Sequence, residues 1–129
     1  MKTGKTPRKK LEDQLDRLWS KCIKTKQKTC WNCNSDIVLQ SHHIRSRGHR
    51  ATRWDLENGL LLCRKCHCMQ KFNPERFQDS VLEIIGQREY DRMKEKSLKI
   101  VKYNMKDLEE VFEFLTEKLR ELEADYGRV

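Results

Sequence analysis

Apolar residues recur three and four positions apart near the start of the chain, and this spacing predicts a helix over residues 11–26. We expect this helix to pack its apolar stripe on the remainder of the domain and to carry no chemistry. Residues 1–10 are polar and basic and include a glycine and a proline, which predicts a disordered basic tail. The stripe of the helix consists of Leu11, Leu15, Leu18, Trp19, Cys22 and Ile23.

Two short apolar runs predict the strands of a hairpin. The first run covers residues 37–39 and the second covers residues 59–62. Residues 45–53 lie between them and contain almost no apolar side chains and one glycine, which predicts a loop. A short helix is expected to begin near Arg64 and to carry His67 across the two strands.

Cap residues and apolar spacing predict three further helices. Asn73 followed by Pro74 marks a helix start, and Gly86 ends that helix. Residues 87–99 form the next helix, and Asn104 caps a long C-terminal one. Its acidic outer face is expected to be a solvated surface, although an apolar stripe of this length could also form a homodimer interface. The stripe of this C-terminal helix consists of Leu108, Val111, Phe112, Leu115, Leu119 and Leu122.

These patterns predict an α+β fold that is mostly helical. Residues 11–72 would form the N-terminal helix and a small domain, and residues 73–129 a helical C-terminal extension. A hydrophobic content of 36% and a mean hydropathy of −0.93 leave little apolar material for a large core. Small domains of this kind commonly need a bound metal for stability.

Four of the six cysteines form two C-x2-C pairs, and this spacing predicts a structural Zn²⁺ site with four thiolate ligands. The spacing suits a metal better than disulfides. We expect Cys22 to be a core residue and Cys68 to be a free buried thiol. No apolar signal segment opens the sequence, so we expect a cytoplasmic protein. The paired residues are Cys30 with Cys33 and Cys63 with Cys66.

Positive charge is concentrated in the part of the chain that holds the cysteines and histidines. The net charge is +8, and residues 1–72 carry 17 Lys and Arg against 6 Asp and Glu. Residues 105–129, by contrast, carry 4 against 8. This distribution predicts that a polyanion such as DNA binds the N-terminal part. The alternative is a basic surface that serves solubility alone.

Three histidines and one asparagine occupy the predicted hairpin and its helix. His42 and His43 follow the first strand, Asn58 precedes the second, and His67 lies on the short helix. A lone histidine is more often a surface residue than a ligand. A hairpin crossed by a helix would, however, bring these four side chains together in one cleft.

This order of residues resembles the HNH nuclease family, whose fold is the ββα-metal finger. The resemblance covers roughly residues 30–71 and is to the branch with a four-cysteine zinc site. Residues 39–47 and 51–58 are also similar to the lambdoid phage NinG/Rap recombination nucleases, although those usually carry glycine and asparagine where this chain has His42 and His67. The matching HNH segments are Ser41-His42-His43-Ile44 and Asn58-Gly59-Leu60-Leu61-Leu62-Cys63-Arg64-Lys65-Cys66-His67.

The resemblance implies a role for each of these residues. His43 would be the general base, and His42 and His67 would hold a catalytic Mg²⁺ or Mn²⁺ ion. Asn58 would orient the loop that follows His43. The implied products carry 5′-phosphate and 3′-hydroxyl ends. The residues expected to contact DNA phosphates are Arg45, Arg47, Arg50 and Arg53.

The expected function is therefore that of a metal-dependent DNA endonuclease of the HNH type. The resemblance to NinG/Rap implies branched recombination intermediates, such as Holliday junctions and D-loops, as substrates. Three alternatives stay open: an HNH nickase acting on ordinary duplex DNA, a zinc-stabilised DNA-binding module without catalysis, and a zinc finger whose acidic C-terminal helix binds another protein. A binding module would leave His42, His43 and Asn58 unexplained.

Overall fold

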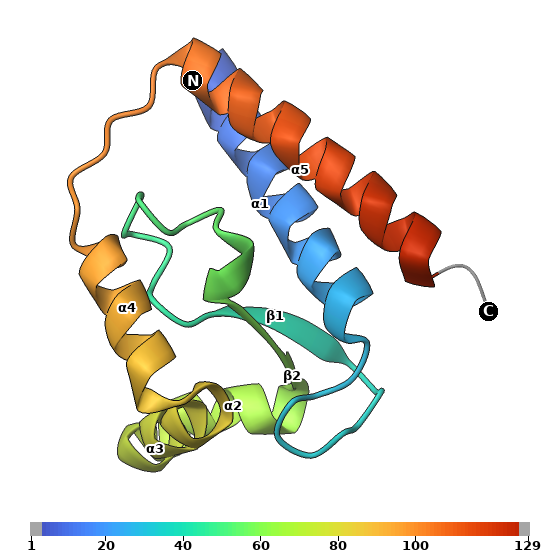
Figure 1. The fold of residues 1–129 in the computed structure, drawn as a ribbon, viewed down its shortest axis with the longest axis vertical. Helices are drawn as coiled ribbons and strands as arrows, with labels where there is room; N and C mark the ends of the chain where they lie inside the picture. Colours follow the sequence, from blue (N-terminus) through green and yellow to red (C-terminus); the bar gives the residue numbers. More distant parts are fainter. Residues whose placement is uncertain (1–3, 127–129) are drawn as a thin grey trace.

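A computed structural model of the chain describes residues 4–126 and shows a mostly helical α+β fold, as the sequence predicts. The described residues form five α-helices, a short 3-10 helix and one two-stranded antiparallel sheet (Figure 1). In chain order the elements are α1 (Pro7–Gln27), β1 (Leu39–His43), η1 (Leu56–Asn58), β2 (Gly59–Cys63), α2 (Arg64–Phe72), α3 (Pro74–Ile85), α4 (Gln87–Ser97) and α5 (Met105–Tyr126).

Helix α1 begins four residues before the predicted helix start. The Thr6 side chain accepts a hydrogen bond from the backbone N–H of Lys9, and Pro7 occupies the first turn, where its missing N–H costs nothing. Residues 7–10 are therefore helical, and the prediction that they belong to a disordered tail is wrong. Residues 1–3, to which the tail prediction also applies, lie outside the described residues.

Strand β1 lies further along the chain than predicted. It covers Leu39–His43, whereas Ile37 and Val38 are 69% and 56% exposed and precede it. The pairing with β2 decides this position, because Leu39 lies opposite Cys63 and His43 lies opposite Gly59. Both histidines of the pair are consequently inside the strand and project to opposite faces of the hairpin.

The hairpin is covered on both faces, which is why all five residues of β2 are buried. Leu61 faces the core built with α1 and α5, whereas Leu60 and Leu62 face α2 and α3. This alternation follows from the two-residue repeat of a strand. In Figure 1 the hairpin lies between α1 on one side and the α2–α3 pair on the other.

Helix α5 returns across the molecule and packs along α1, with both helices running in the same direction (Figure 1). Leu108 and Leu115 of α5 are fully buried against the α1 core residues Leu15 and Trp19. The apolar stripe predicted for the C-terminal helix is therefore largely covered within the same chain. Phe114, which is not part of that stripe, is 55% exposed.

Candidate metal and histidine sites

The four paired cysteines meet in one cluster, as the sequence predicts. Their sulfur atoms all lie within 4.8 Å of one another, and Cys33 Sγ is 3.6 Å from Cys63 Sγ. Thiolates that share a tetrahedral Zn²⁺ at about 2.3 Å lie roughly 3.8 Å apart, so the arrangement fits a structural zinc. The cluster ties the turn after α1 to the start of α2, where Cys63 caps the helix by accepting the N–H of Cys66.

Backbone N–H groups favour the thiolate form of Cys30 in this cluster, whereas burial raises the pKa of the Cys66 thiol to about 12. Burial alone would raise the pKa of the Cys30 thiol, but hydrogen bonds from backbone N–H groups, that of Cys63 foremost, lower it to about 7. A zinc ligand must be deprotonated, so these N–H groups assist metal binding.

The other two cysteines differ from each other. Cys22 is fully buried in the core, as predicted, and burial raises the pKa of its thiol to about 11. Cys68 is half-buried and lines a surface hollow beside Cys33, so the prediction of a buried thiol is wrong.

His42 and His67 come together on the face of the hairpin covered by α2 and α3. His42 Nδ1 lies 3.3 Å from His67 Nε2, and the ring of Phe77 packs edge-on against His42. The Nδ1 atom of His67 is 2.6 Å from Gln40 Oε1. An amide oxygen only accepts, so Nδ1 of His67 carries the proton and Nε2 presents a lone pair toward His42.

This histidine pair fits one divalent ion. Two nitrogens that bind one ion at about 2.1 Å lie roughly 3.0–3.4 Å apart at octahedral or tetrahedral angles, which matches the observed separation. Burial, followed by the charges of His67 and His43, lowers the pKa of His42 to about 4. Burial and the charge of Lys71 also lower the pKa of His67. Both rings are therefore neutral at pH 7, the form that ligates metal.

Gln40 was not singled out by sequence reasoning. It precedes His42 by two positions on β1, so both side chains lie on one face of the strand. The signal available in the sequence was a polar residue two positions before the candidate ligand His42. Its importance depends on the position of β1, which the hydrophobic pattern placed too early.

His43 lies on the opposite face of the hairpin from His42. Its ring stacks on Trp19 with centroids 3.8 Å apart and planes 6° from parallel. His43 Nε2 donates to the backbone carbonyl of Arg53 at 2.9 Å, which leaves Nδ1 as the acceptor of the neutral ring. Burial lowers the pKa of His43, although the Arg53 carbonyl and the charge of Asp16 oppose that effect. The structure thus pairs His42 with His67 and holds His43 on the opposite face of the hairpin, so the four side chains do not share the single cleft that the sequence predicts.

Asn58 is fully buried and clamps the loop that follows β1. Its Oδ1 accepts the N–H of Arg45 at 2.7 Å, and its Nδ2 donates to the carbonyls of Arg45 and Thr52 at 3.0 Å each. Residue 53, whose carbonyl holds His43, belongs to the same loop. Asn58 therefore acts on His43 through the backbone and does not contact the histidine pair in this arrangement.

The four arginines of the loop divide into two groups. Arg53 is 5% exposed and makes a two-point contact with Asp16 at 3.0 and 2.8 Å, so it does not reach the surface. Arg45 is bonded to Ser97 Oγ and to the hydroxyl of Tyr90 on α4. The side chains of Arg47 and Arg50 are 60% and 40% exposed, and they lie 3.7 Å from Asp16 and 3.3 Å from Glu12 respectively.

Acidic residues of α1 receive these arginines, which the sequence did not reveal. Asp16 binds Arg53, and the buried Glu12 lies 3.3 Å from Arg50. Burial opposes the charged form of Asp16, but the hydrogen bond and charge of Arg53 outweigh it and hold the pKa of Asp16 below its usual range. Only tertiary packing brings these partners, which lie 37 and 38 positions apart in the chain, into contact.

Comparisons of the chain with models of known protein families, with curated protein sequences and with solved structures found no match. Within residues 4–126, no helix is both long and apolar enough to cross a membrane.

Proposed function

We propose that this protein is a metal-dependent DNA endonuclease of the HNH type, which hydrolyses phosphodiester bonds. The observation that supports this most directly is the state of the two consecutive histidines of β1. His42 is paired with His67 at a separation suited to one ion. His43, the next residue, is held in the tautomer that leaves Nδ1 able to take a proton.

In this proposal His43 is the general base. Its Nδ1 accepts a proton from the attacking water, and the Arg53 carbonyl stabilises the charged ring that results. Trp19 fixes the orientation of the ring by stacking, and is itself held by a hydrogen bond from its Nε1 to the carbonyl of Asp55 at 2.8 Å. Asn58 keeps the loop of the Arg53 carbonyl in place. Pre-oriented groups of this kind reduce the entropy cost of the reaction.

His42 and His67 would hold the catalytic ion, with Gln40 orienting His67. A Mg²⁺ or Mn²⁺ ion bound there would stabilise the negative charge that develops on the phosphate and on the leaving 3′ oxygen. Among the described residues only the four cysteines form a cluster of three or more candidate metal ligands, so water and substrate would complete the coordination of this ion.

The cysteine cluster has a structural role in this proposal. It joins the turn before β1 to the start of α2, and it therefore determines where α2 places His67. Arg47 and Arg50 would contact backbone phosphates without selecting a sequence. The resemblance to NinG/Rap nucleases supports branched recombination intermediates as the substrate, with ordinary duplex DNA as the alternative.

Cleavage of supercoiled plasmid in Mg²⁺ or Mn²⁺ tests the activity. His43→Ala should abolish nicking while zinc content and DNA binding in EDTA stay at wild-type levels. His49→Ala is the matched control, because His49 is a half-buried histidine of the neighbouring loop and belongs to neither histidine site. If the wild-type protein binds DNA and cuts nothing, the protein is a zinc-stabilised binding module and the proposal fails.

Cleavage of four-way junctions, D-loops and linear duplex of matched length tests the substrate. Faster cleavage of the branched forms is expected. Equal rates on all three substrates would indicate a nickase of ordinary duplex DNA instead of a recombination nuclease. The proposed catalytic roles of the residues would not change.

A further inference from the structure

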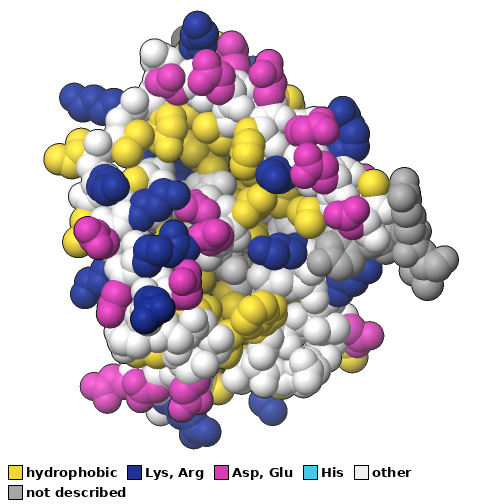
Figure 2. Space-filling model, viewed as in Figure 1, with side chains coloured by type: hydrophobic (Ala, Val, Ile, Leu, Met, Phe, Trp, Pro, Cys, Tyr) yellow, Lys and Arg dark blue, Asp and Glu magenta, His cyan; other side chains and the backbone are white. Residues whose placement is uncertain are grey.

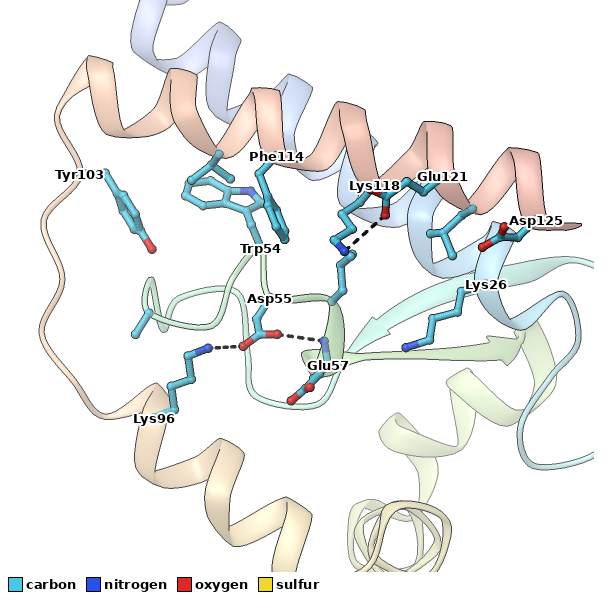
Figure 3. A pocket seen from close by; sticks show the side chains of 14 residues that line it. Lys26, Trp54, Asp55, Glu57, Lys96, Tyr103, Phe114, Lys118, Glu121 and Asp125 are labelled. Carbon is cyan, nitrogen blue, oxygen red and sulfur yellow. Dashed lines mark hydrogen bonds and ion pairs between the residues drawn. The ribbon is translucent and has the colours of Figure 1, made fainter.

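A groove lies between α5 and the segment that leads into β2. It has a volume of about 570 Å³, and Figure 3 shows Trp54, Tyr103 and Phe114 around its upper part. None of the residues placed in catalysis or metal binding lines it. Its apolar lining residues are Ala51, Trp54, Leu56, Tyr103, Val111, Phe114 and Leu122.

Phe114 forms a ridge at the edge of this groove. Its side chain is 55% exposed and borders a second hollow of about 450 Å³, which Tyr103 and Val111 also line. A contiguous patch of exposed apolar side chains on a protein surface commonly marks an interaction site.

The charges around the groove are mixed in sign. Figure 2 shows apolar side chains on this face bordered by both cationic and anionic groups. A chain with a net charge of +8 thus has a nearly neutral face here. A polyanion would be bound better by a face with cations alone, so the groove does not suit DNA. The charged lining residues are Lys26, Lys96 and Lys118 with Asp55, Glu57, Glu121 and Asp125.

We propose that this face binds a second copy of the same chain, with the Phe114 ridge of each copy in the groove of the other. A two-fold interface requires one patch to be complementary to itself. This patch contains both a ridge and a hollow, and it contains both signs of charge. The proposal does not depend on the nuclease activity.

Sedimentation analysis of the full chain tests the interface. The wild-type protein should have twice the 15.6 kDa mass of one chain, and Phe114→Glu should reduce the mass to that of one chain. Phe72→Glu is the matched control: Phe72 is 84% exposed at the end of α2 and does not line the groove, so the dimer should persist. Circular dichroism checks that each variant is folded. A wild-type protein that is monomeric up to high micromolar concentration would overturn the proposal.

A charge-exchange experiment tests whether this face is the interface between the two copies. K26E/K118E and E121K/D125K each give the groove one predominant sign, so each variant alone should be monomeric. An equimolar mixture should recover the dimer mass, because the two faces are then complementary. If both variants remain dimeric alone, or if the mixture stays monomeric while wild type dimerises, the interface lies elsewhere.

Discussion

Asn58→Ala removes three hydrogen bonds from the loop that holds His43. The side chain is fully buried, and its loss leaves the N–H and carbonyl of Arg45 and the carbonyl of Thr52 without this partner. Each such bond contributes about 1 kcal/mol net, so the variant should lose about 3 kcal/mol of unfolding free energy. For a domain of this size that corresponds to a decrease in melting temperature of roughly 10 °C.

The same substitution should reduce activity beyond its effect on stability. A loop released from Asn58 no longer fixes the Arg53 carbonyl, and misplacing a catalytic group by about 1 Å can cost about 100-fold in rate. Nicking should therefore be measured at a temperature at which circular dichroism shows the variant to be folded.

Gln70→Ala is the control for both measurements, because Gln70 is an exposed amide on α2. A melting temperature for Asn58→Ala within about 2 °C of wild type would refute the stability argument. Full activity in a folded Asn58→Ala variant would refute the positioning of His43 through the loop.

Three further outcomes follow from the sites. Cys30→Ser, or removal of zinc by a chelator, should unfold the domain, because site formation and folding are coupled. Atomic absorption measures the zinc and circular dichroism measures the folding. A variant that keeps its zinc and melts normally would contradict this prediction. Gln40→Leu should weaken Mn²⁺ binding about 10-fold to 100-fold in calorimetry by releasing the His67 ring, while zinc content is unchanged. Because the folded pKa of Asp16 lies below its ordinary value of 3.8, its stabilising effect is present above that pH and is lost below it. Asp16→Asn should therefore flatten the acid limb of melting temperature against pH, and an unchanged limb would show that the Asp16–Arg53 pair contributes little.

Local patterns in the sequence predicted the helices and the cysteine cluster. Helical periodicity and cap residues depend on neighbours within a turn or two, so Asn73, Pro74 and Gly86 mark the ends of α3 correctly. The two C-x2-C pairs likewise carry their geometry in their own spacing. Composition also indicated a small core, and the structure has two modest clusters on the two faces of the hairpin.

Tertiary structure decided what the histidines and arginines contact. The position of β1 depends on its pairing with β2, and a shift along the strand changes which side chains share a face. The contacts of His67 with His42 and Gln40 therefore could not be derived from hydrophobicity alone.

The burial of Arg53 has a similar cause. Its partner Asp16 lies on a helix that is remote in sequence, and nothing in the arginine-rich loop indicates it. The sequence by itself determined most of the elements and the kinds of ligand, because those depend on short-range spacing, whereas the bounds of β1 depended on its pairing with β2. The contacts among them were decided by strand register and helix packing, which are long-range properties of the folded chain.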